Sequence, residues 1–260
     1  MTGSVVVSDA GAKGVCRVTM NRPGVLNAFD HEMAEGLAVV LNEIRLDLSV
    51  RAVVLTGAGR GFCAGGDVAA MKASPNPATY IEELSRRLHQ SLQAILRMPQ
   101  VVIAAVNGPV AGGGLGLSLA CDMRIAAESA TFSAGHLKLG ISPDGGPTFF
   151  LPRLAGDAAA AHLLLAGAKY TARDALARGL VIEVVPDVAL DARAIALAAQ
   201  IAKAPRTAVA QTKSLLRQTW SRSLETQLEE ERSGLSTTGR TPSFKEGLAA
   251  FLEKRPPNFG

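Results

Sequence analysis

Cysteine is scarce in this 260-residue chain, and its three copies lie far apart. Cys16, Cys63 and Cys121 form no pair with the short spacing of a zinc or redox motif, and an odd number suits no disulfide framework. We therefore expect no metal site, no disulfides, and a reducing compartment, the cytoplasm, as the location. A chain of this length can bury a sufficient core as one α/β unit without such cross-links.

Aromatic residues and clustered charges are scarce as well. Aromatics make up 4% of the chain, and the formal net charge of +4 comes from scattered basic residues rather than one run. Nucleic-acid binding uses a dense basic stripe with aromatics for stacking, so it is not expected. No apolar run is long enough to cross a membrane, and the first residues lack a signal-peptide pattern. The small positive excess suits either a solvated surface or a small polyanionic ligand.

Short apolar runs alternate with helical patterns through the first half of the chain. Runs typical of strands lie at 14–20, 52–56, 101–106, 123–126 and 130–133. Asp30 suits the N-cap of a helix ending near Leu46, and a second helix spaces apolar residues from Ile81 to Ile95 along one face. This recurring unit of strand, glycine-rich loop and helix predicts α/β layers with parallel strands and the loops on one side.

The second half of the chain has a different character, with alanine-rich helical patterns after Ala155. Only one further strand is predicted, at 181–185. Thr171 and Asp174 have the spacing of a capping box that begins a short helix. A helix is also predicted at 115–120, directly after a glycine-rich loop.

The tail from Lys203 onward is helical in pattern and carries many leucines. Its apolar side chains exceed what a small helical segment can bury on itself. We therefore divide the chain into a core at 1–202 and a helical segment at 203–260. That segment is expected to dock on another copy of the chain, or to pack on its own.

Two glycine-rich loops, at 57–67 and 107–116, each follow a buried strand. No Gly-Lys-Ser/Thr follows either loop and the dinucleotide spacing is absent, which excludes nucleotide loops of those kinds. Each loop leads into a helix start, where free N–H groups and the helix dipole favour negative charge. Such a pair of donors can stabilise an oxyanion, although tight turns alone would also use these glycines. No Gly-x-Ser-x-Gly elbow is present, which argues against a serine hydrolase.

Five segments together carry a more specific pattern. They are NRPGVLNAF at 21–29, FCAGGD at 62–67, NGPVAGGG with ACD at 107–122, GISPDGGPTFFLPRL at 140–154 and EGLAAFLEKR at 246–255. Each glycine motif is weak alone. In this order they cover essentially the whole chain and resemble the crotonase (enoyl-CoA hydratase/isomerase) superfamily.

This resemblance implies an α/β fold, a spiral of ββα units with a helical C-terminal part that builds trimers or pairs of trimers. It also implies an acyl-CoA substrate, with coenzyme A as part of that substrate and no separate cofactor. The N–H groups of Gly66 and Gly113 would form the oxyanion hole for the thioester carbonyl. By position, the coenzyme A contacts would be Leu26, Ala28, Ala64, Asp67 and Val68, with Phe251 and Lys254 reaching the coenzyme of a neighbouring subunit. Asp67 would also cap a helix.

The acidic residues separate the possible reactions. Hydratases of this family use two glutamates, and those positions here hold Gly116 and His136. Asp144, in Ser-Pro-Asp-Gly-Gly, is by itself an ordinary turn residue. Family isomerases, including those acting on ring-derived epoxides of phenylacetyl-CoA, have a similar acid here. In them it moves a proton from beside the thioester to the γ-carbon.

We therefore expect an isomerase that converts 3-enoyl-CoA into 2-enoyl-CoA, with Asp144 as acid and base. The alternatives are a hydratase that places water with His136 or Asp144, and a non-catalytic acyl-CoA-binding protein. Apolar neighbours are expected to surround the Asp144 carboxyl: Ile141, Phe149, Phe150 and Leu151.

The remaining candidate side chains have simpler interpretations. His136 could act as acid or base or orient a water, although a single pocket histidine more often has a packing role. The helical histidines are expected to face solvent or fill surface gaps: His31, His89 and His162. Cys63, beside the first oxyanion position, is expected to be a small apolar filler.

Overall fold

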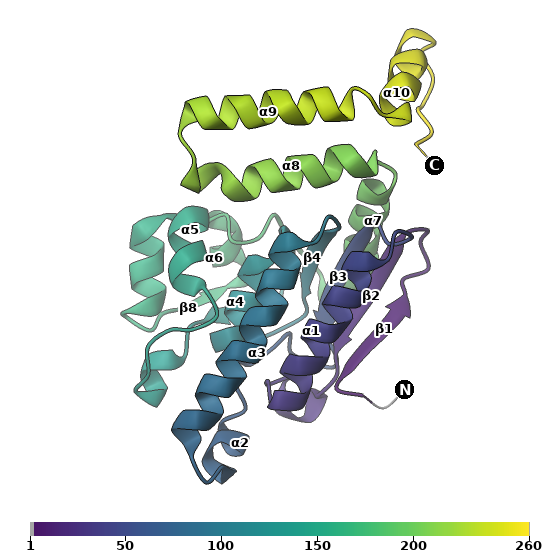
Figure 1. The fold of residues 1–260 in the computed structure, drawn as a ribbon. Coiled ribbons are helices and arrows are strands. Elements are labelled where there is room, and N and C mark those ends of the chain that lie inside the picture. Colours follow the sequence, from purple (N-terminus) through teal and green to yellow (C-terminus); the bar gives the residue numbers. More distant parts are fainter. Residues whose placement is uncertain (1–2, 260) are drawn as a thin grey trace.

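A six-stranded sheet forms the centre of the computed structural model, which describes residues 3–259 (Figure 1). In spatial order its strands are β1 (Val5–Asp9), β2 (Val15–Met20), β3 (Ala52–Gly57), β4 (Val101–Val106), β6 (Met123–Ala127) and β9 (Glu183–Val185). β1 pairs antiparallel with β2, and each later pair is parallel. The predicted parallel sheet is confirmed, and β3 and β4 read as unbroken apolar runs because both of their faces are buried.

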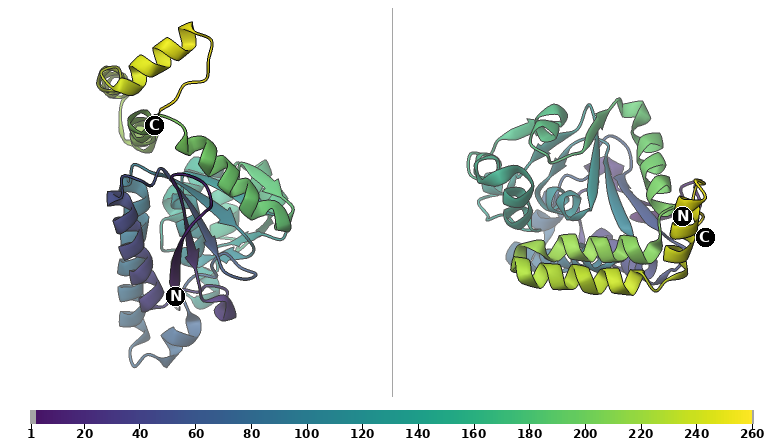
Figure 2. Two further views of the ribbon diagram at one scale, coloured as in Figure 1. Left: turned by 90° about the vertical axis from the view of Figure 1, so that its right-hand side faces the viewer. Right: turned by 90° about the horizontal axis from the view of Figure 1, so that it is seen from above.

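Helices cover both faces of this sheet (Figure 2). On one face lie α1 (His31–Leu46) and α3 (Pro77–Arg97), and on the other lies α7 (Leu190–Ala202). Alternate side chains of β3 point to opposite faces of the sheet. Leu55 lies in the core beneath α1 and α3, and Val54 lies in the core beneath α7. Asp30 caps α1 as predicted, because its carboxylate accepts the N–H of Met33 at 2.8 Å.

A second, three-stranded sheet and several shorter helices lie beside the main sheet. They are β5 (Val110–Ala111), β7 (Thr131–Ser133) and β8 (Lys169–Thr171), with α2 (Val68–Ala73), α4 (Gly112–Ala120), α5 (Pro147–Leu164) and α6 (Ala172–Ala177). The prediction of only one strand after Ala155 is wrong. β8 has three residues and buries only Tyr170, too short a pattern to read from sequence. The capping box of Thr171 and Asp174 is confirmed at the start of α6.

The helix predicted at 115–120 begins earlier, at Gly112. Glycines fill its first turn, and their low helix propensity hides the start of the helix in the sequence. This earlier start matters for the site, because it makes Gly113 part of the first turn of α4.

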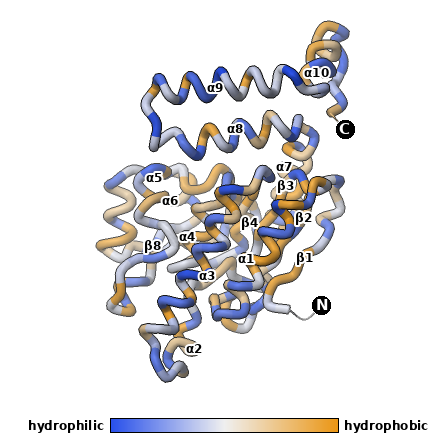
Figure 3. Tube along the Cα trace, in the orientation of Figure 1, coloured by the Kyte–Doolittle hydropathy of each residue, from blue (hydrophilic) through white to orange (hydrophobic). Residues whose placement is uncertain are grey.

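The tail is helical, as predicted, and consists of α8 (Arg206–Gln218), α9 (Leu224–Thr238) and α10 (Pro242–Leu252). α8 is tied to the core by the buried Lys213, whose Nζ lies 2.8 Å from Oδ2 of Asp122. α9 and α10 stand away from the sheet (Figures 1 and 2). Figure 3 shows a largely hydrophilic α9, yet Leu235 and Phe251 are among large apolar side chains left exposed on the tail.

Cys16, Cys63 and Cys121 are buried and free. Burial raises the pKa of Cys63 to about 12, so its thiol stays neutral and serves as an apolar filler. Within residues 3–259, no group of side chains gathers that could hold a metal ion. None of the helices in that range has both the length and the apolar character to cross a membrane.

Candidate active site

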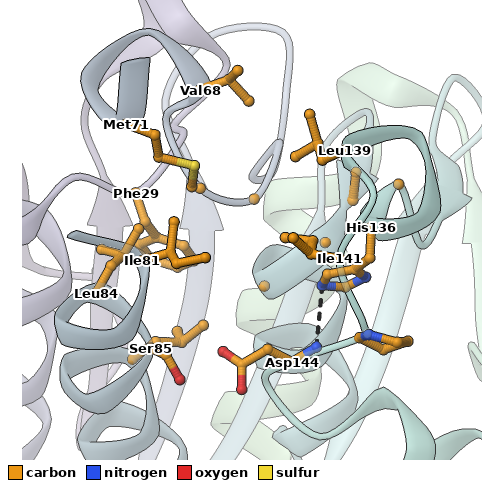
Figure 4. Close-up of a pocket in the computed structure, with 18 of the residues that line it drawn as sticks. Phe29, Val68, Met71, Ile81, Leu84, Ser85, His136, Leu139, Ile141 and Asp144 are labelled. Atoms are coloured by element: carbon orange, nitrogen blue, oxygen red, sulfur yellow. Dashed lines mark hydrogen bonds between the residues drawn. The ribbon is translucent and has the colours of Figure 1, made fainter. Parts of the chain in front are cut away.

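A cavity of about 740 Å³ opens between α2, α3, the start of α4 and the segment 134–144 (Figure 4). Much of its lining is apolar, including Met71, Leu84 and Ile141. At one end, Ser85 on α3 and Asp144 face each other (Figure 4). The cavity therefore combines an apolar chamber with one polar end, and both glycine-rich loops reach its wall.

Gly66 in the first loop offers a free backbone N–H to the cavity. The N–H of Phe29 donates to Gly65 O at 2.7 Å, and the N–H of Asp67 donates to Phe29 O at 2.8 Å. These two bonds form a parallel bridge between Phe29 and Gly66, so the N–H of Gly66 itself points away from Phe29. Among residues 3–259 it has no acceptor, and a substrate oxygen could take that place.

Gly113 in the second loop supplies a matching donor. The N–H of Gly112 is already bonded to Ala134 O at 2.9 Å, whereas the N–H of Gly113 finds no acceptor in the described chain. Gly113 lies in the first turn of α4, where such groups are unpaired and the helix dipole is positive. Gly65 has a φ of +93°, and a Cβ there would come within 3.4 Å of Gly113 N, so this glycine permits the close approach of the loops.

Charged side chains fix the end of the first loop through hydrogen bonds and ion pairs. Asp67 accepts the N–H of Ala70 at 3.1 Å and pairs with Arg22 at 2.9 Å, and Arg22 also pairs with Asp30. Burial alone would raise the pKa of Asp67, but the hydrogen bonds from Ala70 and Arg22 lower it. The predicted capping role of Asp67 is confirmed, and its carboxylate fixes the loop rather than lining the cavity.

Gly116 on α4 has no room for a side chain. A Cβ at this position would overlap the carbonyl oxygen of Gly145, so the backbone of 142–146 fills the space that a side chain would need. The segment that carries Asp144 is thereby packed directly against α4. The absence of a side chain at Gly116 and the placement of Asp144 belong to one packing arrangement.

Asp144 lines the cavity, but the apolar enclosure predicted for it is wrong. Its side chain is 41% exposed, and Oδ1 lies 2.8 Å from Nε2 of His89 on α3. Phe149 is exposed and lines a separate hollow beside α8. Phe150 lines the same hollow, and its ring lies close to Gly146 at the end of the turn. His89 is exposed, as predicted, and it also contacts this carboxylate, which the sequence did not indicate.

His136 contacts the backbone of the same segment. Its ring is 7% exposed, and its Nε2 accepts the N–H of Asp144 at 3.3 Å (Figure 4). The ring proton is therefore assigned to Nδ1, a buried atom without a partner among residues 3–259. Burial lowers the pKa of His136, although nearby Asp144 raises it in part, so the ring is neutral at pH 7.

The residues predicted to contact coenzyme A fall into two groups. Ala64 and Val68 line the cavity, and Leu26 lies directly behind, where its carbonyl accepts the N–H of Ala64 at 3.0 Å. The carbonyl of Ala28 is already bonded to Arg22. By contrast, Phe251 and Lys254 belong to the region of α10, at the opposite end of the molecule from α2 (Figure 1). One chain alone does not bring them to the cavity.

The family model for enoyl-CoA hydratase/isomerase matches residues 10–260. The chain therefore belongs to the enoyl-CoA hydratase/isomerase family and is an enzyme of the crotonase fold. It is 40% identical to 1,2-epoxyphenylacetyl-CoA isomerase of Escherichia coli K12 over 249 residues, 95% of each chain. A probable enoyl-CoA hydratase of Rhodobacter capsulatus is also 40% identical, again over 95% of each chain. The solved structure of an enoyl-CoA hydratase from Bacillus anthracis superposes with a TM-score of 0.94 at 35% identity, covering 98% of both chains.

Proposed function

We propose that the protein is an enoyl-CoA isomerase that converts 3-enoyl-CoA into 2-enoyl-CoA, with Asp144 as the proton carrier. The observation that supports this most is Gly116, whose missing side chain gives its space to the Asp144 segment. Glu82 is another carboxylate along the cavity, but its side chain is 78% exposed and lies 3.9 Å from Arg86 at the rim. Asp144 lines the cavity and faces Ser85 across it, which supports its choice as the proton carrier.

The reaction follows from these groups. The N–H groups of Gly66 and Gly113 hold the thioester oxygen, which accepts negative charge as Asp144 removes a proton from the α-carbon. The electron pair of that C–H bond moves into the dienolate. Asp144 then returns the proton to the γ-carbon, and the double bond comes to rest beside the thioester. No water is consumed.

A hydratase is the second candidate, since relatives and solved structures similar to this chain have that name. Purified protein is therefore given 3-enoyl-CoA and 2-enoyl-CoA of the same chain length in separate assays. We expect fast conversion of the 3-enoyl ester and at most slow hydration of the 2-enoyl ester. Fast hydration with no isomerisation would make the protein a hydratase, and binding without turnover would make it an acyl-CoA-binding protein. The name of the Escherichia coli relative adds a ring-derived acyl-CoA as a third substrate to test.

We further propose that coenzyme A lies along Leu26, Ala28, Ala64, Asp67 and Val68, and that a second copy of the chain adds Phe251 and Lys254. The tail supports this proposal, because Phe251 is 79% exposed and α10 stands away from its own core. Light scattering at micromolar concentration is expected to report a trimer or a pair of trimers. A monomer, or full activity after removal of residues 240–260, would exclude this arrangement.

A further inference from the structure

The polar end of the cavity includes a contact that the reaction above does not use. His89 reaches the Asp144 carboxylate across the gap between α3 and 142–146, with Nε2 2.8 Å from Oδ1. Ser85 lies one turn earlier on α3, and its Oγ is 3.4 Å from the same nitrogen. Ser85 and Asp144 line the cavity, whereas His89 is not part of the lining and contacts the carboxylate from outside it.

We propose that His89 is a positioning residue for Asp144, an inference that rests on the proposed isomerase function. Its Nε2–H donates to Oδ1 and fixes the plane of the carboxylate. Oδ2 is then the oxygen that takes the proton from the α-carbon as that C–H bond breaks. The same O–H bond breaks when the proton is delivered to the γ-carbon, so a single oxygen serves both steps.

Asp144 needs such support because the hydrogen bond to His136 fixes its backbone N–H and not its carboxylate. His136 holds the N–H of Asp144, but nothing on 142–146 contacts the carboxylate, and two glycines follow directly. The side chain is 41% exposed, so it would rotate into solvent without a partner. α3, in contrast, is 21 residues long and buries Leu88 and Leu92 in the core around His89. The histidine therefore ties a half-exposed acid to a long helix that is anchored in the core, and orientation of this kind is a large part of catalytic rate.

In the proposed contact, His89 is the hydrogen-bond donor and the Asp144 carboxylate is the acceptor. The test therefore replaces His89 in two ways. His89→Leu removes it, whereas His89→Gln keeps an amide N–H at a similar distance along the side chain but cannot ionise. Gln90→Leu is the matched control, because Gln90 is exposed on the same helix and faces away from the cavity. Each variant is assayed with 3-enoyl-CoA beside the wild type and Asp144→Asn.

His89→Leu is expected to lower kcat by about 10- to 100-fold while KM changes less than about twofold, the loss typical of a hydrogen bond to a charged group. His89→Gln is expected to recover kcat to within about threefold of the wild type, and Gln90→Leu to leave it unchanged. Wild-type kcat in His89→Leu, or no recovery in His89→Gln, would overturn the positioning role. Wild-type activity in Asp144→Asn would overturn the proposed function itself, so the two failures are distinguishable.

Discussion

The two walls of the cavity are built by different means. The donor wall consists of backbone N–H groups at Gly66 and Gly113, fixed by backbone hydrogen bonds to Phe29 and at Gly112. The acid wall consists of the Asp144 side chain, whose position depends on contacts from two histidines, His89 and His136. The donor wall needs only glycine and a fixed backbone. The acid wall depends on which side chains meet there.

This difference separates activation of the substrate from the choice of reaction. Backbone donors activate any thioester that enters, whatever reaction follows. In the proposed reaction the acid wall decides where the proton is placed, so it would select the reaction. Changes on the acid wall should therefore alter kcat and the product, whereas changes on the donor wall should slow every reaction of a bound acyl-CoA.

Removal of the acid should have the largest effect. Asp144→Asn keeps the size of the side chain but removes the base, so kcat with 3-enoyl-CoA should fall by about 10²- to 10⁴-fold. Binding of a non-reactive acyl-CoA, measured by calorimetry, should stay close to that of the wild type because the donor wall is intact. Wild-type turnover in this variant, with activity abolished in His136→Ala, would assign the base to His136 instead.

Introducing a glutamate at position 116 should not create a hydratase. Gly116→Glu would push its side chain into the Gly145 carbonyl and displace the segment that carries Asp144. Isomerisation should fall by about 100-fold, since a displacement near 1 Å can cost that much, and Tm should fall as well. The check is the ratio of hydration to isomerisation. A gain in hydration at unchanged Tm would show that the position of Asp144 does not depend on the close contact between Gly116 and Gly145.

A disturbance of the donor wall should have a smaller effect on rate and none on the choice of product. In Gly113→Ala the new Cβ would lie 2.7 Å from Cδ2 of Leu88, the end of a flexible side chain. We expect about a 10-fold lower kcat as the donor shifts. Leu88→Ala in the same chain provides space for the Cβ, so the double variant should regain part of the rate. A changed product would contradict the division between walls.

The smallest effect concerns pH and His136. Burial lowers the pKa of His136 below its ordinary value of 6.5, so the unfolded chain binds a proton more readily than the folded one. The stabilisation from the neutral ring is complete above pH 6.5 and declines as pH falls toward the lowered folded-state pKa. His136→Gln should flatten this decline in Tm, and at pH 7 should lower kcat less than about 10-fold, below the usual contribution of a general base. A larger loss of kcat would place His136 in the chemistry.

The parts of the site that depend on local backbone were predictable from sequence. β4 matches its predicted range because it is an unbroken apolar run, and both glycine-rich loops, singled out in the sequence, reach the cavity wall. Asp30 and Thr171 were assigned correctly because a cap needs only neighbouring residues. Such features are determined within a few positions along the chain.

The parts that depend on distant packing were not predictable in the same way. His89 and Asp144 are 55 positions apart, and no local pattern signals that α3 faces the turn. The spacing of Ser85 and His89 by one helical turn was the single hint that this face is polar. Phe149 was misplaced for the same reason, since nearness in sequence was read as nearness in space.

The central claim is that Asp144 moves a proton without adding water. Mass spectrometry of the first product formed from 3-enoyl-CoA, in water labelled with a heavy oxygen isotope, tests it most directly. We predict a product of the same elemental composition as the substrate, free of the label, with the double bond conjugated to the thioester. A first product that is heavier by one labelled water, formed as fast as the substrate disappears, would contradict the account.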